Sequence, residues 1–148
     1  MERYSREELV ALFEEKGIHK TLQRIEMAYI LLNKNQHLSA EDVNQLINHS
    51  FPKASRATIF NNLKVFVDSG LIKKLEILPG VTTYDTNTSE HHHFLDVETG
   101  QIEDIEPSDP KQEKALRLAQ KLLRKSIHPD IEAEDIQIII RGKKAATA

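Results

Sequence analysis

Hydrophobic residues recur at helical spacing three times in the first third of the chain. The three patterns begin just after Ser5, Thr21 and Ser39, whose side chains can cap a helix by accepting hydrogen bonds from its first N–H groups. Gly17 is placed to end the first helix, and residues 33–37 are expected to form a polar loop between the second and third. The apolar positions lie three or four residues apart and give each helix one face for a core: Leu9, Leu12, Phe13, Ile25, Ala28, Tyr29, Leu32, Val43, Leu46 and Ile47.

A fourth helical pattern follows Ser55 and has an unusually polar second face. Its expected buried residues are Ala57, Ile59, Leu63 and Phe66. The outward face then carries short hydrogen-bonding groups and cations: Ser55, Arg56, Thr58, Asn61, Asn62 and Lys64. Residues 71–78 and 81–84 are typical of two strands joined by a Pro-Gly turn. Three helices, a polar-faced helix and a hairpin predict a winged helix-turn-helix DNA-binding domain over residues 1–84.

The polar face of this fourth helix has two interpretations. Most amphipathic helices simply expose such a face to water. Here a hairpin follows the helix, and residues 53–67 contain Lys53, Arg56 and Lys64 but no acid. Asn can read adenine, Arg can read guanine, and Ser or Thr can contact phosphate. We therefore favour a recognition helix that binds double-stranded DNA.

The rest of the chain predicts a small sheet with one helix. Strands are expected at residues 93–97, 101–105 and 135–141, and a helix at residues 110–125. Such a unit is small, and its aliphatic last strand would leave an open sheet edge. A two-fold homodimer would cover that edge and match DNA half-sites. The fold class is therefore α+β, with a hinge at residues 85–90 and a C-terminal α/β metal-binding and dimerisation domain over residues 91–148.

Composition narrows the class of protein. The chain has 148 residues, 39% of them hydrophobic and 29% charged, and it contains no cysteine. These values are typical of a globular protein, and no apolar run approaches the ~20 residues that a membrane span needs. We expect a cytoplasmic protein without a membrane partner. The net charge is −3, so any DNA surface must be a local stripe on a chain that is not basic overall.

Histidines and aspartates near the hinge predict a metal site. Residues two apart on a strand share a face, so His91 and His93 should point together while His92 points away. A tight turn at residues 98–100 would bring Asp104 opposite or diagonal to His93. Asp85 ends the hairpin, and His37 lies in the polar loop. Three imidazoles and two carboxylates suit Fe(II) or Mn(II) with room for one further oxygen ligand: His37, Asp85, His91, His93 and Asp104.

Each of these residues also has an ordinary explanation. A triple histidine can be a solvated polar run or a weak adventitious metal binder. His37 taken alone reads as a surface loop residue, and Asp85 and Asp104 as acids at strand ends. It is their joint arrangement that favours a metal site.

Several motifs resemble the ferric uptake regulator superfamily over almost the whole chain. They are Thr21-Leu22-Gln23-Arg24, His37-Leu38-Ser39-Ala40, the helix from Ser55 to Leu63, Ser69-Gly70-Leu71-Ile72 and His91-His92-His93. Within it, the chain is most similar to the peroxide-responsive repressor branch, in the sequence Ala57–Leu63 and in having aspartate at position 104. The resemblance implies the same five metal ligands, and it adds Gln23, Arg24 and Phe60 to the residues expected to contact DNA.

One departure from the family pattern concerns zinc. The family commonly carries two Cys-x-x-Cys pairs that bind a structural zinc ion. The corresponding positions here are Asp96, Thr99, Lys144 and Thr147, so no structural zinc is expected. The family's additional His/Glu metal site is also unsupported, since only His92 falls near it.

The resemblance implies a repressor and not an enzyme. Metal would close a dimer into a DNA-binding shape, and with Fe(II) peroxide would oxidise a ligand histidine, His37 or His91, and release the DNA. Three alternatives stay open: a regulator of iron, manganese or zinc uptake that senses metal level, a metal-free winged-helix repressor, and a non-haem metal enzyme. Two histidines and a carboxylate can activate oxygen, but no acid/base pair accompanies them here.

Overall fold

The computed structural model describes residues 3–51 and 54–146, and Lys53 of the expected DNA stripe lies outside them. The chain divides into two compact units, Met1–Ser89 and Glu90–Ala148. The expected hinge at residues 85–90 stays a prediction. Among the described residues no helix has the length and apolar character that crossing a membrane requires.

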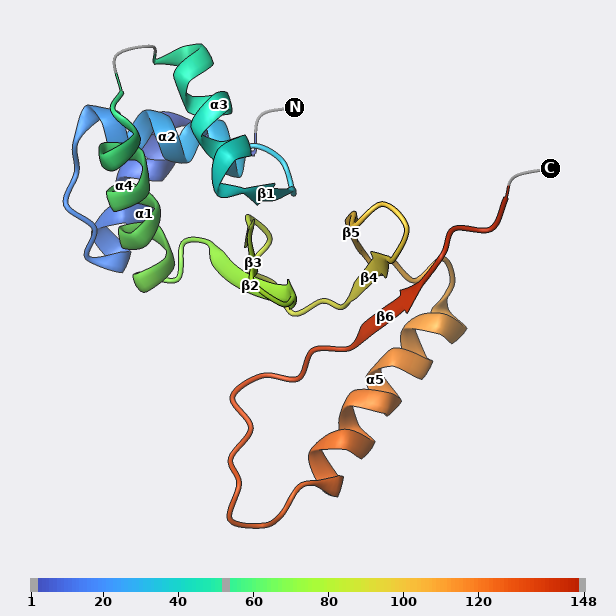
Figure 1. The fold of residues 1–148 in the computed structure, drawn as a ribbon. Helices are drawn as coiled ribbons and strands as arrows, with labels where there is room; N and C mark the ends of the chain where they lie inside the picture. The colour runs from blue at the N-terminus through green and yellow to red at the C-terminus, as the bar shows by residue number, and fades with distance from the viewer. Residues whose placement is uncertain (1–2, 52–53, 147–148) are drawn as a thin grey trace. The chain divides into compact units, whose positions relative to one another are not determined.

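Four helices form most of the first unit (Figure 1): α1 (Arg6–Lys16), α2 (Leu22–Leu32), α3 (Ala40–Ser50) and α4 (Arg56–Asp68). Each begins after a capping hydroxyl, and the side chains of Ser5, Thr21, Ser39 and Ser55 all accept a hydrogen bond from a first-turn N–H group. At the end of α1, Gly17 has a φ of 68°, a left-handed conformation that glycine adopts without steric cost. The four predicted helix starts are therefore confirmed.

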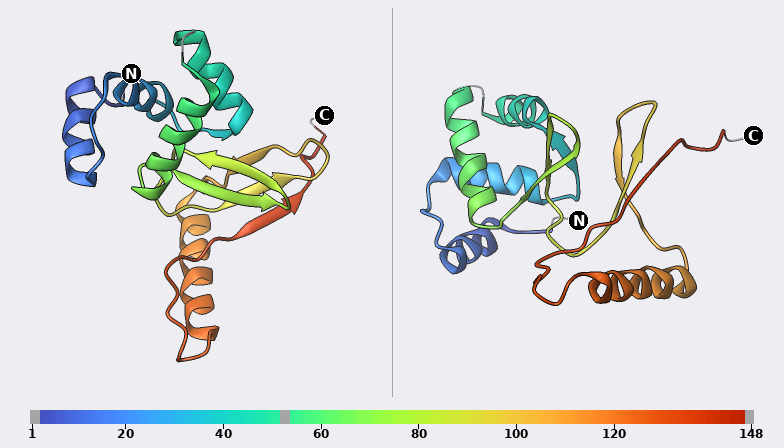
Figure 2. Two further views of the ribbon diagram at one scale, coloured as in Figure 1. Left: turned by 60° about the vertical axis from the view of Figure 1, so that its left-hand side comes forward. Right: turned by 60° about the horizontal axis from the view of Figure 1, so that its bottom comes forward.

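A three-stranded antiparallel sheet completes this unit, with strands β1 (His37–Ser39), β2 (Lys73–Leu78) and β3 (Val81–Asp85) in the order β1-β3-β2. Strands β2 and β3 form the predicted hairpin, which Figure 2 shows as two antiparallel arrows. The prediction of a loop at His37 was wrong, because His37 opens β1 and pairs with Asp85. Three residues are too few to show a strand pattern, and the pairing partner lies far along the chain.

The core of the first unit is apolar and joins all four helices. Two aromatic rings meet in it, Phe13 of α1 and Phe66 of α4, with ring centroids 5.8 Å apart. Leu9, Met27, Val43, Ile47 and Ile59 are also fully buried. Burial of aromatic and aliphatic side chains drives this packing, and it fixes helix α4 against the other three.

Two expectations about α4 were wrong. Ala57 is exposed, whereas Asn62 is buried. The buried positions are Ile59, Asn62, Leu63 and Phe66, which are spaced as one helical stripe. Sequence reasoning assigned Asn62 to the outer face only because its side chain is polar.

The second unit contains β4 (His93–Asp96), β5 (Ile102–Asp104), α5 (Pro110–Ser126) and β6 (Ile139–Gly142). Its strands lie in the order β5-β4-β6, with β4 antiparallel to β5 and parallel to β6. The last strand is shorter than the expected range 135–141, and residues 127–138 run back from α5 to reach it (Figure 2). No described residue of α5 is buried. The predicted α+β class is confirmed.

Candidate functional site

The first unit brings one imidazole and one carboxylate together. His37 and Asp85 are register partners on β1 and β3, and His37 Nε2 lies 3.3 Å from Asp85 Oδ2. The second carboxylate oxygen of Asp85 accepts a hydrogen bond from the N–H group of Asn87 at 2.9 Å. The Asp85 side chain is buried and that of His37 is 14% exposed. The hydrogen bond to Asn87 leaves Oδ2 directed at the imidazole.

Thr86 fixes the short strand that carries His37. Its N–H group donates to the Gln36 carbonyl at 3.2 Å, and its Oγ1 accepts from the Gln36 N–H group at 3.0 Å. The same hydroxyl donates to the Lys34 carbonyl at 2.9 Å. These bonds extend the β1–β3 pairing and hold His37 beside Asp85 at the edge of a small sheet.

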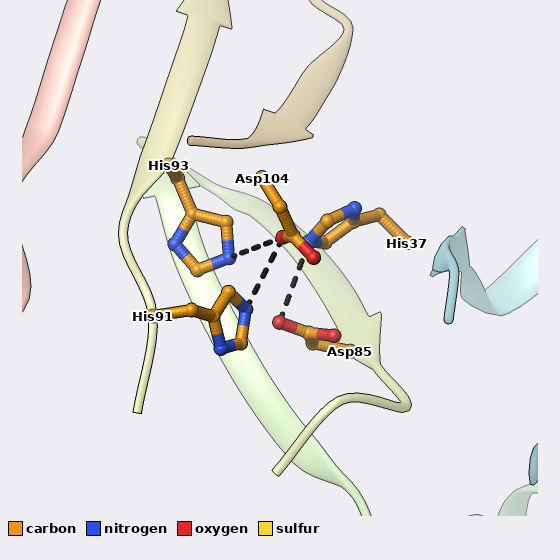
Figure 3. A group of neighbouring side chains, drawn as sticks. All are labelled: His37, Asp85, His91, His93 and Asp104. Carbon is orange, nitrogen blue, oxygen red and sulfur yellow. Dashed lines mark ion pairs between the residues drawn. The ribbon is translucent and has the colours of Figure 1, made fainter. Parts of the chain in front are cut away.

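The second unit brings together two imidazoles and one carboxylate (Figure 3). His93 and Asp104 are register partners on β4 and β5, as strand alternation and a tight turn predict. Asp104 Oδ1 lies 3.2 Å from His91 Nε2 and 3.5 Å from His93 Nε2. The rings of His91 and His93 meet edge to face with centroids 4.6 Å apart. The His93 side chain is fully buried and that of His91 is 11% exposed.

His92 has a different environment from its two neighbours, in agreement with the alternation of faces. Its Nδ1 accepts a hydrogen bond from the N–H group of Ile138 at 3.1 Å. The N–H group of His93 donates to the Ile138 carbonyl at 3.0 Å. Burial lowers the pKa of His92 and so favours the neutral ring that can accept such a bond. His92 therefore attaches the segment before β6 to the strand that carries His93.

The donor atoms suit a divalent transition metal. The first unit offers one imidazole and one carboxylate and the second offers two imidazoles and one carboxylate, and such a mixture of donors suits iron, manganese, zinc, nickel or cobalt. The nitrogen–oxygen distances within each unit, 3.2 to 3.5 Å, exceed the ~2.8 Å of a charge-assisted hydrogen bond. They match the ~3.0–3.5 Å between two ligand atoms that share one ion at ~2.1 Å. The residues present fit a metal ion.

No structural zinc site of four thiolates can form, because the chain has no cysteine. Asp96 stands at the first of the four positions where the family commonly has cysteine. Here it closes the turn between β4 and β5. Its Oδ1 accepts hydrogen bonds from the N–H groups of Glu98 at 2.9 Å and Thr99 at 3.3 Å. The N–H group of Val97 donates to the Gly142 carbonyl at 2.9 Å and connects this turn to β6. Hydrogen bonds therefore form the turn without a metal.

The Asp96 turn gives a pH prediction. The hydrogen bond from the Glu98 N–H group holds the pKa of Asp96 below its ordinary value. A lowered folded-state pKa stabilises the fold above about pH 4, and this contribution is lost as the pH falls through the folded-state pKa. We expect Asp96→Asn to be less stable than the wild type at pH 6 and to approach it at acid pH. Urea unfolding followed by circular dichroism measures both, with Asp130→Asn, an exposed carboxylate, as control; a constant difference at every pH would contradict the prediction.

The residues expected to contact DNA lie on two helices. Gln23 and Arg24 are in the first turn of α2, and the others are on or next to α4. Ser55, Arg56, Asn61 and Lys64 are exposed, whereas Thr58 and Phe60 are partly buried. Their contacts with DNA stay a prediction.

Asn62 joins α4 to α2 inside the protein. Its Oδ1 accepts from Arg24 Nε at 3.0 Å, and its Nδ2 donates to Met27 Sδ at 3.4 Å. Arg24 also donates from its guanidinium to the His19 carbonyl at 3.0 Å. The expected outward direction of Asn62 was wrong, and its observed contacts fix the orientation of α4.

Sequence reasoning missed two acids that contact the cations of α4. Glu41 Oε2 lies 2.6 Å from the Arg56 guanidinium, and Asp68 Oδ2 lies 2.7 Å from Lys64 Nζ. The spacing of Lys64 and Asp68, four residues apart on one helix, could have revealed the second pair. The pair between Glu41 and Arg56 depends on the packing of α3 on α4 and leaves no signal in the sequence.

Comparison with known proteins places the chain in a family. Residues 15–138 match the Ferric uptake regulator family. The chain is 34% identical over 116 residues to the peroxide-responsive repressor PerR of Staphylococcus aureus strain Mu50, which covers 78% of this chain and 77% of that protein.

Solved structures show the same fold. The ferric uptake regulator from Pseudomonas aeruginosa with manganese aligns with a TM-score of 0.72 at 20% identity, over 91% of this chain and 96% of that one. The Campylobacter jejuni peroxide stress regulator aligns with a TM-score of 0.64 at 21% identity, over 95% and 96%. The N-terminal helices with their β-wing and the C-terminal α/β unit form the fold of these regulators. The chain therefore belongs to the Ferric uptake regulator family, whose members are metal-dependent transcription regulators and not enzymes.

Proposed function

We propose that this protein is a transcriptional repressor that binds DNA in its Fe(II) or Mn(II) form and senses peroxide by metal-catalysed oxidation of a ligand histidine. The observation that carries the proposal is that each unit has its own group of imidazole and carboxylate side chains with donor atoms that suit a divalent metal. His37 and Asp85 form one group, and His91, His93 and Asp104 form the other. A single ion that takes ligands from both groups would make the arrangement of the units depend on metal.

Linkage gives this arrangement a regulatory consequence. An ion that binds all five side chains only in a closed arrangement shifts the population toward that arrangement. The closed form would present α4 of each protomer to DNA at a fixed spacing, as two half-sites require. His37 and Asp85 would fix the first unit relative to the ion. Asp104, which contacts two imidazoles, would fix the second.

The α5 helix supports a homodimer. Its residues Leu118, Leu122 and Leu123 are exposed, and so is Ile140 of the edge strand β6. Exposed apolar residues of this number on a small unit are typical of an interface. We propose a two-fold dimer that acts on a double-stranded DNA operator in the cytoplasm, without a structural zinc ion.

The exposure of the histidines fits peroxide sensing. His37 and His91 are partly accessible, whereas His93 is fully buried. His91 also lines an open hollow of about 550 Å³, together with Glu90, Ile105 and Gln120. A solute as small as hydrogen peroxide can approach His91 from this side.

The oxidation balances without a further reactant. One oxygen atom of hydrogen peroxide is added to the imidazole of His37 or His91, which becomes 2-oxo-histidine, and the other leaves as water. Fe(II) held by these residues would lend one electron to break the O–O bond and would regain it when the hydroxylated imidazole is oxidised, so the iron would end as Fe(II). Mn(II) would support DNA binding without this reaction. An oxidised imidazole is a poorer nitrogen ligand, so the closed arrangement loses its stabilisation and DNA is released.

An anaerobic metal titration tests the proposal. A duplex is first selected from a random-sequence library with the Mn(II) protein, and its mobility shift is then followed against added Fe(II) or Mn(II). We expect saturable binding that EDTA reverses and that peroxide abolishes only in the Fe(II) form. Equal binding without metal would indicate a metal-independent repressor, and reversal by chelator but not by peroxide would indicate a regulator that senses metal level.

A further inference from the structure

The two cations on the exposed face of α4 are both held by acids of the same unit. Arg56 contacts Glu41 of α3, and Lys64 contacts Asp68 at the end of α4. All four side chains are more than half exposed. Exposed ion pairs of this kind contribute little to stability, typically about 0–1 kcal/mol. Their main effect is on the charge that α4 presents to a ligand.

Asp68 stands where the helix itself disfavours an acid. It is the last residue of α4, and the partial negative charge at a helix C-terminus repels a carboxylate. The order of the pair, with Lys64 four residues before Asp68, is also the weaker of the two possible orders. The stability of α4 therefore gives no reason for an acid at this position.

Asp68 also lies in a basic hollow beside the helix. Lys64, Lys74 and Tyr84 line this space of about 300 Å³ with Phe60, Val67 and Asp68. Two ammonium groups and a phenol hydroxyl are suited to bind a phosphate group. The carboxylate of Asp68 neutralises part of the positive charge of this hollow and repels a phosphate.

Glu41 has a similar position at the other end of the helix. The Arg56 guanidinium lies over the Phe60 ring, 5.7 Å from its centroid, while it contacts Glu41. A phosphate that approaches Arg56 meets the negative charge of this carboxylate. The Glu41 carboxylate lies in the first turn of α3, where the partial positive charge of the helix N-terminus stabilises it. Its contact with Arg56 of α4 is therefore a second role beside the stabilisation of α3.

We propose that Glu41 and Asp68 are specificity-determining residues that suppress binding to DNA of arbitrary sequence. Non-specific affinity comes almost entirely from cations that replace the counterions of phosphates, so acids that neutralise Arg56 and Lys64 weaken it strongly. Base contacts from residues such as Asn61 do not depend on these charges, so specific binding keeps a larger share of its affinity. The inference rests on the proposed DNA-binding function.

The test compares two duplexes with the full-length Mn(II) protein, one selected from a random library and one of mixed sequence. Fluorescence anisotropy gives Kd against KCl concentration for the wild type, Glu41→Gln and Asp68→Asn. Glu15→Gln on α1, an exposed acid, is the control for net charge. We expect each test variant to bind the mixed duplex about three- to tenfold more tightly at low salt, with a log–log salt slope steeper by up to about 0.9 for each cation that is freed. The selected duplex should gain less, so the specificity ratio falls.

A second comparison excludes indirect effects. Glu41→Gln should give no gain when Arg56→Gln is already present, and thermal unfolding should show that each variant is folded. Gains equal to that of Glu15→Gln, or a gain by Glu41→Gln that persists without Arg56, would overturn the inference. Failure of the wild type to bind even the selected duplex would overturn the DNA-binding function itself, a separate outcome.

Discussion

His37→Ala is expected to weaken metal-dependent DNA binding by about a hundredfold, near the upper end of typical coupling energies between two sites. The substitution removes the imidazole that lies 3.3 Å from Asp85 in the first unit. Asp85 alone would then link this unit to the metal, so binding of an ion would favour the closed arrangement much less. Gel-shift titrations with Mn(II), on the selected duplex, measure the loss.

The fold should survive this substitution. His37 joins β3 through backbone pairing, and the neighbouring pair of Leu38 and Tyr84 is independent of the imidazole. The Mn(II) ion should still bind, more weakly, through His91, His93 and Asp104. His49→Ala, which removes an exposed imidazole at the end of α3, serves as the control. Tight DNA binding by His37→Ala without metal would show that the two units are not coupled through an ion.

The contrast between β4–β5 and β1 shows what local sequence could predict. His93 and Asp104 flank a tight turn, and strand alternation together with that turn predicted them to lie opposite or one step diagonal to each other; they are register partners. His37 and Asp85 pair through a three-residue strand with no pattern of its own. Their proximity depends on hydrogen bonds between Thr86 and residues 34–36, and side chains that meet only through tertiary structure leave no periodic signal.

Helix α4 shows a second limit. Its capping residue and the buried positions Ile59, Leu63 and Phe66 follow from the sequence, but the polarity of Asn62 concealed its place in the buried stripe. A buried amide is acceptable only where partners satisfy it, and Arg24 and Met27 provide them from another helix. Glu41 shows the same limit of sequence-based prediction, because its contact with Arg56 depends on the packing of α3 against α4.

Treatment of the Fe(II) protein with hydrogen peroxide is expected to add one oxygen atom to the peptide that carries His37 or to the peptide that carries His91. Both side chains are partly accessible, and each has its Nε2 within 3.3 Å of an aspartate oxygen of the candidate group. Oxygen transfer at a bound ion is confined to groups that touch it, so histidines outside the ligand set should remain unmodified, and the full burial of His93 keeps peroxide in solution from its ring. Peptide mass spectrometry after anaerobic loading and a short peroxide pulse measures the product.

Two comparisons within the same sample make this result specific to the candidate site. His128 lies on an exposed segment after α5, with its side chain 67% exposed, so peroxide in solution reaches it more easily than His37 or His91. Oxidation of His37 or His91 with His128 intact therefore requires a metal-directed reaction. The Mn(II) form should show neither modification nor loss of DNA binding. If the Fe(II) form releases DNA while His37 and His91 both stay unmodified, release must follow another route, such as oxidation and loss of the ion, and the histidine-oxidation mechanism is wrong.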